Sequence, residues 1–283
     1  MAKQPQARDR GTHGARLLRA LAEEGRQVFS TAEAMEIALR IGVPEPYVRQ
    51  LLALMVRNGW LVRLRRGLYA TSGVASGAVE VHPFLIATRL VSPSAISHWS
   101  ALNYHGLIDQ VPRVVTAFTP KRVVTPSMRR RNRNGRARHA WEVVGVRYEY
   151  VSVKKEHFFG IEEVWVGENA KVPITDPERT TLEAFISPRV FGGIGTGLAI
   201  VENHIQELDA GKLVEYALRY GKTSVAKRVG WALERAQVRE PVWAPLLRVP
   251  TTRYHTLDPT LPRRGSCDSR WMILDNLPRR RGQ

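Results

Sequence analysis

Arginine and glutamine side chains near the N-terminus are spaced for contact with nucleic acid. Arg49, Gln50, Ala53 and Arg57 fall on one side of a predicted helix. Arginine and glutamine donate hydrogen bonds to the guanine and adenine edges that the major groove of DNA displays. We therefore expect this side of the helix, Ala53 included, to contact DNA.

A second group of arginines follows at a predicted hairpin. Arg63, Arg65 and Arg66 lie at or beside its turn, where they would contact phosphates or enter the adjacent minor groove. Ser30 and Thr31 begin another predicted helix, whose N-terminus favours an anion such as phosphate. The alternative is a basic face on a protein-interaction module, and the arginine-tipped hairpin favours DNA over that alternative.

Helices and a hairpin must position these side chains. A first helix is predicted over residues 15–24, before a glycine, and a second over residues 30–40, where Ser30 and Glu33 have the spacing of a capping box. A third is predicted over residues 46–58, with a proline in its first turn and an apolar face opposite the basic one.

The hairpin is predicted from alternation with a period of two. Trp60, Val62 and Leu64 alternate with Leu61, Arg63 and Arg65, so the two sets are expected on opposite faces of a strand. Gly67 permits a tight turn before residues 68–70 return. Helices followed by a basic hairpin predict a winged helix-turn-helix in residues 1–75.

The charge of the chain is concentrated in particular segments. The 283 residues include 43 Lys and Arg against 26 Asp and Glu, a net charge of +17. Residues 1–75 carry a net +6, residues 239–283 carry +5, and residues 121–139 hold 8 basic side chains and no carboxylate. Clustering of this kind favours a polyanion as partner.

The remaining sequence predicts an α+β fold class with a larger second domain. Residues 71–77 read as a linker, residues 80–238 as a mixed domain with a basic loop at 121–139, and residues 239–283 as an irregular tail rich in proline and arginine. Strands are predicted at 114–118, 147–153 and 164–166, and helices at 200–208, 212–220 and 223–233. Within the loop, the predicted secondary nucleic-acid contacts are Arg129, Arg130, Arg131 and Arg133.

The middle domain has residues that could do chemistry, but their spacing favours structural roles. His98 and His105 are too far apart on one helix to share a metal, and Asp176 has the position of a helix N-cap. Residues 192–197 are glycine-rich without the lysine that a P-loop requires, and no acidic residue is followed two positions later by Lys, as a common nuclease site needs. We expect no enzyme activity, cofactor or metal.

The single cysteine and the N-terminal sequence indicate the cellular compartment in which the protein is expected. Cys267 alone excludes an intramolecular disulfide framework and a zinc site of several cysteines. No apolar stretch follows the basic N-terminus as a secretory signal would require, and no segment predicts a membrane helix. We expect a cytoplasmic protein that does not bind a membrane.

An ordered set of motifs resembles a known family. The motifs are Arg-Gly-Leu-Tyr at 66–69, Ser-His-Trp-Ser-Ala-Leu-Asn-Tyr-His-Gly-Leu at 97–107 and Asp-Pro-Glu-Arg-Thr at 176–180. In this order they resemble the AbiEi-type antitoxins, the transcriptional-regulator partners of type IV toxin–antitoxin systems. The resemblance extends over about residues 15–238.

The resemblance implies a regulator with two tasks. The N-terminal domain would bind inverted repeats of double-stranded DNA in its own promoter, and the second domain would neutralise a nucleotidyltransferase-like toxin in phage defence by abortive infection. The resemblance is compatible both with direct binding of the toxin by the second domain and with neutralisation without such contact. The alternatives are a basic adaptor for an acidic protein or RNA, and a nucleic-acid-processing enzyme, against which the missing catalytic patterns count.

Overall fold

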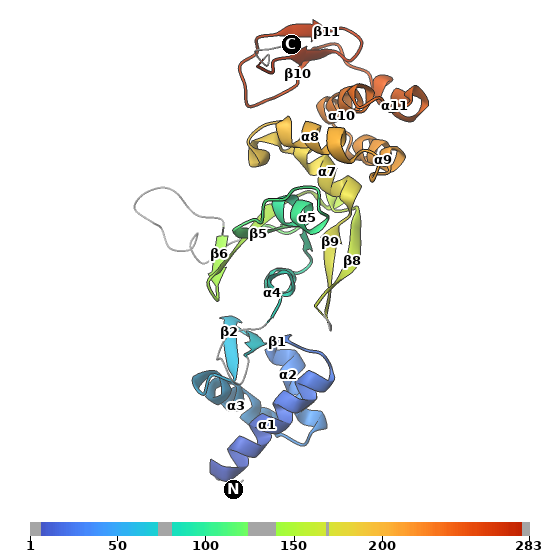
Figure 1. The fold of residues 1–283 in the computed structure, drawn as a ribbon. Helices are drawn as coiled ribbons and strands as arrows, with labels where there is room; N and C mark the ends of the chain where they lie inside the picture. Colours follow the sequence, from blue (N-terminus) through green and yellow to red (C-terminus); the bar gives the residue numbers. More distant parts are fainter. Residues whose placement is uncertain (1–6, 73–80, 124–139, 168–169, 279–283) are drawn as a thin grey trace. The chain divides into compact units, whose positions relative to one another are not determined.

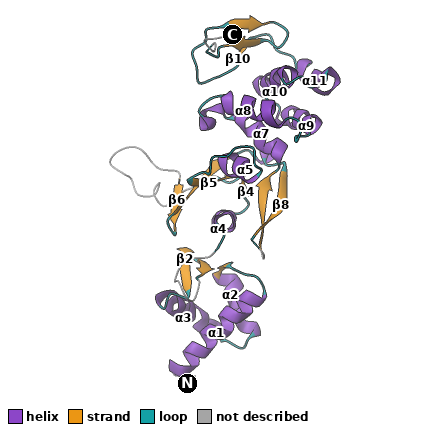
Figure 2. Ribbon diagram, in the orientation of Figure 1, coloured by secondary structure: helices purple, strands orange, loops and turns teal. Residues whose placement is uncertain are grey.

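The computed structural model describes residues 7–72, 81–123, 140–167 and 170–278. Contacts within the chain group it into two compact units. The first contains residues 1–94, 121–150 and 163–173, and the second contains residues 95–120, 151–162 and 174–283. Figure 1 traces the elements in chain order, and Figure 2 separates helices from strands. Among the described residues, no helix is both long and apolar enough to cross a membrane.

The first unit begins with a winged-helix arrangement. Helices α1 (Ala7–Glu23), α2 (Thr31–Arg40) and α3 (Glu45–Arg57) accompany a sheet of β1 (Val28–Ser30), β3 (Leu68–Thr71) and β2 (Leu61–Arg65), in that spatial order. The predicted second and third helices are confirmed to within two residues, whereas α1 starts earlier than predicted and β1 was not predicted. Apolar residues spaced along the three helices form one core, which includes Leu17, Leu21, Ile37, Leu51, Leu52 and Met55.

The hairpin differs from the strict alternation predicted for it. The pairing of β2 with β3 shifts register between Arg63 and Arg65. Because of this irregularity, Leu61 and Leu64 are both buried although they lie three positions apart, while Arg63 and Arg65 both stay exposed. The prediction that Leu61 shares a face with the arginines was therefore wrong.

The predicted capping box at the start of α2 is confirmed. The Ser30 hydroxyl accepts from the Glu33 backbone N–H at 3.2 Å, and the Glu33 carboxylate accepts from the Ser30 backbone N–H at 2.6 Å. The same carboxylate forms ion pairs with Arg26, at 3.0 Å, and with Arg89. Burial raises the pKa of Glu33, but these hydrogen bonds and Arg89 hold it below its usual value.

Glu33→Gln is expected to lower the free energy of unfolding by about 1 kcal/mol at neutral pH, because glutamine keeps the capping geometry but loses the charge. A lowered folded-state pKa contributes stability above the ordinary carboxyl pKa, and this contribution disappears as pH falls through the folded value. In urea titrations the difference between variant and wild type should therefore shrink as the pH falls below the ordinary carboxyl pKa, and it should vanish once the pH is below the lowered pKa of folded Glu33. Glu36→Gln, at an exposed position of the same helix, is the control, and a pH-independent difference would contradict the assignment.

A six-stranded sheet has the order β6-β7-β5-β4-β9-β8. Its strands are β4 (Ala95–Ile96), β5 (Val114–Thr119), β6 (Ala140–Val143), β7 (Val146–Ser152), β8 (Ile161–Val166) and β9 (Ala170–Thr175). The short β4 pairs antiparallel with β5 and parallel with β9, so the sheet is mixed as predicted. Helices α4 (Pro83–Leu90) and α5 (His98–Tyr104) and the 3-10 turn η1 (Lys155–His157) lie between strands in the sequence.

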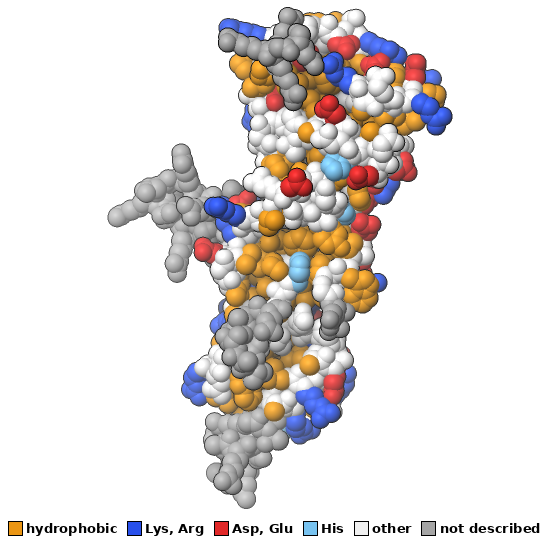
Figure 3. All heavy atoms as spheres, viewed as in Figure 1, with side chains coloured by type: hydrophobic (Ala, Val, Ile, Leu, Met, Phe, Trp, Pro, Cys, Tyr) orange, Lys and Arg blue, Asp and Glu red, His pale blue; other side chains and the backbone are white. Residues whose placement is uncertain are grey.

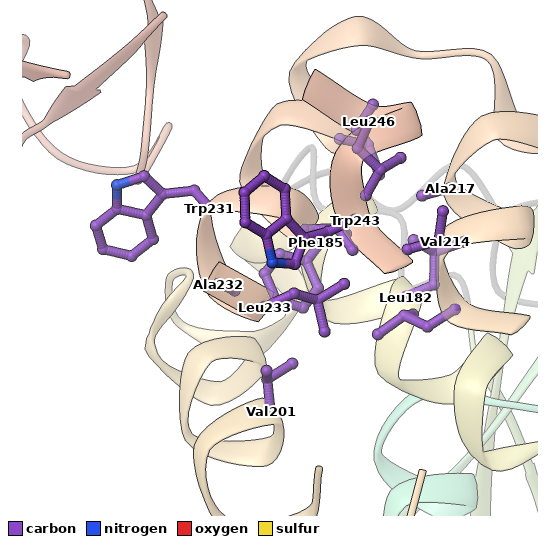
Figure 4. Packing of buried hydrophobic residues seen from close by; sticks show 14 of the residues in the cluster. Leu182, Phe185, Val201, Val214, Ala217, Trp231, Ala232, Leu233, Trp243 and Leu246 are labelled. Carbon is purple, nitrogen blue, oxygen red and sulfur yellow. The ribbon is translucent and has the colours of Figure 1, made fainter. Parts of the chain in front are cut away.

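The second unit ends in a group of helices around an aromatic and aliphatic core. These are α7 (Pro177–Ile186), α8 (Gly195–His204), α9 (Ala210–Tyr220), α10 (Thr223–Arg235) and α11 (Glu240–Leu247), with a 3-10 turn η2 (Pro188–Phe191). Figure 4 shows how Phe185, Leu233 and Trp243 approach one another from α7, α10 and α11. The helical end is thus confirmed, and with it the predicted α+β fold class.

Residues 239–278 form regular elements, although an irregular tail was predicted for residues 239–283. They form α11 and a small sheet of β10 (His255–Thr256), β12 (Ile273–Asp275) and β11 (Ser266–Asp268). Trp271 is fully buried in the same core as α10, and its ring occupies the space that a Cβ at Gly230 would need. The physical reason is that widely separated apolar residues of this segment complete a core that no local periodicity reveals.

Candidate nucleic-acid interface

One face of α3 presents the predicted DNA-contacting side chains to solvent. Arg49, Gln50, Ala53 and Arg57 are all exposed. The opposite face packs into the core of the first unit through Val48, Leu51, Leu52 and Met55. The helical period places these two sets on opposite sides, so the apolar set fixes the direction in which the basic set points. In Figure 3, Lys and Arg side chains lie over the N-terminal helices.

A surface depression follows this face of α3. It is lined by Tyr47, Gln50, Ala53, Leu54 and Arg57. Tyr47 and Leu54 were missed in the sequence, although Tyr47 stands one helical turn before Gln50 and so shares its side of the helix. The Tyr47 hydroxyl is buried and has no hydrogen-bond partner among the described residues. The depression therefore combines the apolar side chains of Ala53 and Leu54 with the exposed polar side chains of Gln50 and Arg57.

Arginines on and off this face differ in their partners. Away from it, Arg19 pairs with Glu23 at 2.9 Å, and Arg26 and Arg40 both pair with Glu24. Within the described part of the chain, Arg49 and Arg57 make no ion pair, and neither do the wing arginines. Glu23 and Glu24 thus pair with arginines away from this face, whereas the arginines of the face have no ion-pair partner among the described contacts.

The wing, defined here as β2, the turn at residues 66–67 and β3, presents Arg63, Arg65 and Arg66 as exposed side chains. Arg65 Nη1 donates to the Arg66 carbonyl at 3.4 Å. Burial raises the pKa of Tyr150, and the positive charge of Arg65 partly offsets this effect. Arg65 is therefore close to Tyr150 of β7.

Ser30 and Thr31 lie beside the turn of the wing. The Thr31 backbone N–H donates to the Gly67 carbonyl at 3.0 Å, and its hydroxyl faces the same glycine. The N-terminus of α2 is already occupied by the Glu33 carboxylate, whose negative charge would oppose a phosphate at that end. These two residues belong to the wing group and are separate from the face of α3. The predicted secondary contacts, Arg129, Arg130, Arg131 and Arg133, lie outside the described residues.

The two histidines of the middle segment have structural partners, in agreement with their predicted role. His98 starts α5, is fully buried, and its Nδ1 lies 2.8 Å from the Ser97 hydroxyl. Burial lowers the pKa of His98, opposed by Glu183. His105 follows α5, and its Nε2 lies 2.7 Å from the Thr175 carbonyl oxygen.

The Asp-Pro-Glu-Arg-Thr motif begins α7 as predicted. The Asp176 carboxylate accepts from the Arg179 backbone N–H at 2.7 Å, which is the N-cap interaction. The sequence did not reveal that the rest of the motif is a buried ionic network. Arg179 is fully buried, lies 2.8 Å from Glu183 in an ion pair, and stacks over Phe159 at 4.9 Å. Lys212 pairs with Asp176 and Glu178 at 3.2 and 2.9 Å.

Other candidates for chemistry do not assemble into a site. Cys267 is exposed, and no His, Asp or Glu contact to its sulfur is found in the described part of the chain. Gly192 and Gly193 form a turn and Gly195 begins α8, so the glycine-rich segment connects two elements, as predicted. No group of three His, Cys, Asp or Glu side chains suited to a metal occurs among the described residues.

The fold and the basic face of α3 define a class of protein. In this class a winged-helix domain with a basic, exposed third helix is joined to a larger α+β portion. Residues 16–72 match the family model described as transcriptional regulator, AbiEi antitoxin, which confirms the predicted resemblance over that segment. A search of curated proteins gives no match.

The fold is also similar to that of a solved structure. The crystal structure of the RV2827C protein from Mycobacterium tuberculosis aligns with a TM-score of 0.63 at 15% sequence identity. The alignment covers 94% of this chain and 92% of that chain. At this identity the likeness concerns the fold alone, and it extends the similarity from the winged helix to nearly the whole chain.

Proposed function

We propose that this protein is a DNA-binding transcriptional autorepressor and antitoxin. The observation that carries the proposal is the basic face of α3, where Arg49, Gln50 and Arg57 are exposed without carboxylate partners among the described contacts. An α-helix fits the major groove of B-DNA, and these side chains have the donors that read base edges there. The match of residues 16–72 to the AbiEi regulators supports this assignment.

In this proposal the two groups of residues have different tasks. The face of α3 reads bases, while Arg63, Arg65 and Arg66 hold phosphates and contribute little to sequence preference. The target is inverted-repeat DNA upstream of its own gene, so the protein acts in the cytoplasm. The antitoxin task belongs to the residues beyond 80, acts against a nucleotidyltransferase-like toxin, and needs no catalytic group of this chain.

The two tasks can be separated in cells. Wild type should repress a reporter gene fused to the upstream DNA. The double variant Arg49→Ala with Arg57→Ala should fail to repress it. The same variant should still protect cells that express the neighbouring toxin, when its own expression is driven from an unrelated promoter. Loss of protection together with repression would contradict the division of tasks, and repression that survives the substitutions would contradict the interface.

Arg65→Ala with Arg66→Ala is expected to weaken binding to upstream and unrelated DNA alike. Each arginine that contacts a phosphate displaces about one counterion when the complex forms. Losing two such contacts should reduce the steepness of log K against log salt by about 2. Fluorescence anisotropy over a salt series measures this slope. An unchanged slope would show that the wing does not contact phosphate.

A further inference from the structure

A small hollow in the second unit is lined by cationic and hydroxyl side chains. It lies where η2 and the start of α10 face Pro259. Its cations are Arg189, Lys222 and Arg228. The remaining lining residues are the hydroxyl-bearing Ser187 and Ser224 and the apolar Ile186, Pro188, Val190 and Pro259.

Among the described residues, the cations of this hollow form no ion pair with a carboxylate. Arg228 is only 5% exposed, and its Nε and Nη2 both donate to the Thr256 carbonyl, at 3.1 and 2.9 Å. In the described part of the chain no carboxylate forms an ion pair with Arg189, Lys222 or Arg228, whereas Lys212 nearby in the sequence has two. A buried charge without a counter-charge is costly, so the hollow favours an anion.

The acidic residue with the strongest influence on Arg228 is already committed. Burial lowers the pKa of Arg228, and Asp258 opposes this effect. The Asp258 carboxylate accepts from the Ile194 backbone N–H at 2.9 Å and from the Thr260 backbone N–H at 2.7 Å. Asp258 therefore interacts with Arg228 through its charge, but its carboxylate oxygens are engaged by these backbone donors and it forms no ion pair with Arg228 among the described contacts.

The N-terminus of α10 borders the hollow through Lys222 and Ser224. Asp176 caps α7 and Asp209 caps α9, but no side chain caps α10, where Lys222 occupies the N-cap position. The first N–H groups of a helix have no partner within it, and together with the helix dipole they favour a negative charge. Lys222 at this N-cap and Ser224 in the first turn of α10 line the hollow together with Arg189 and Arg228.

We propose that this hollow binds the phosphate group of a small phosphomonoester. A terminal phosphate has a charge of about −1.5 to −2 and three acceptor oxygens, which suits guanidinium, ammonium and hydroxyl donors together. The apolar walls, among them Pro188, Val190 and Pro259, provide a surface for the organic part of the ligand. The same chemistry could be supplied by a nucleic-acid phosphate. The site lies in the second unit and is independent of the interface proposed on α3.

The test is calorimetric titration of the full chain with AMP, inorganic phosphate, adenosine and a short DNA duplex. Lys222→Ser removes a cation and places a favourable N-cap residue at α10, so this variant should fold at least as well as wild type. Arg189→Ser changes an exposed side chain of the same hollow. Arg239→Ser, an exposed position without a side-chain contact among the described interactions, is the matched control.

Wild type is expected to bind AMP and inorganic phosphate, but not adenosine. Lys222→Ser and Arg189→Ser should each weaken AMP binding by about tenfold, the effect of one lost charged hydrogen bond, while Arg239→Ser leaves it unchanged. Absence of AMP binding by wild type, or equal binding by the hollow variants, would overturn the proposal. If Lys222→Ser weakened binding of the duplex but not of AMP, the hollow would be assigned to nucleic acid, and the proposal of a small phosphomonoester would be overturned.

Discussion

Arg49→Ala combined with Arg57→Ala is expected to weaken binding to the upstream DNA by about a hundredfold. Each arginine that contacts a base edge contributes about 1–3 kcal/mol, and about 1.4 kcal/mol corresponds to a factor of ten. Both side chains are exposed and neither supports the core, so the variant should unfold at the same temperature as wild type. Anisotropy titrations at one fixed salt concentration measure the change.

A matched control separates base contacts from loss of net charge. Arg239→Ala with Arg248→Ala removes two exposed arginines from the second unit and leaves α3 intact. Gln50→Ala is informative in another way, because losing an amide that reads a base should relax sequence preference more than it reduces overall affinity. An equal loss of affinity in the control variant would show that binding depends on total charge and not on the face of α3.

Trp271→Ala is expected to lower the free energy of unfolding by about 3–5 kcal/mol, the usual cost of removing a large buried aromatic side chain. Trp271 is fully buried, its ring lies 5.4 Å from that of Trp243, and its indole N–H donates to Glu234. The loss would therefore include packing, an aromatic contact and a hydrogen bond. Chemical denaturation followed by circular dichroism measures the difference.

The matched control for this prediction is Trp165→Ala. Trp165 is 60% exposed, so the same change of side chain there should alter stability by less than about 0.5 kcal/mol. A small effect of Trp271→Ala would mean that residues 239–278 are not an integral part of the second unit. A large effect would agree with the structure, in which α10, α11 and β12 share one core.

The winged helix could be predicted from the sequence because its signals are local. Ser30 and Glu33 mark a helix start, Pro46 occupies a first helical turn, and Gly67 permits the turn of the wing. The apolar period of α3 also fixed which side chains face solvent. The register shift in β2 was missed, because whether Leu61 is buried depends on the core beneath it and not on the alternation of its neighbours.

The second unit was less predictable because its structure depends on distant contacts. Trp271 packs against Gly230, forty-one positions earlier, and Arg228 donates to the carbonyl of Thr256. Prolines at residues 241 and 245 suggested irregular chain, yet one is in the first turn of α11 and the other is tolerated inside this short helix. The burial of Arg179 was hidden for the same reason: Glu183 lies on the same helix, but Phe159 and the His157 carbonyl, which also contact Arg179, come from another segment.

The most direct test of the central claim is titration of the full chain against its own upstream DNA, beside scrambled DNA of equal length, at two salt concentrations. Direct contacts with base edges resist salt better than phosphate contacts alone, because only the latter depend wholly on counterion release. The proposed function predicts a specific complex with the upstream DNA that persists at the higher salt concentration. Equal binding to both DNAs that disappears at the higher salt would contradict it.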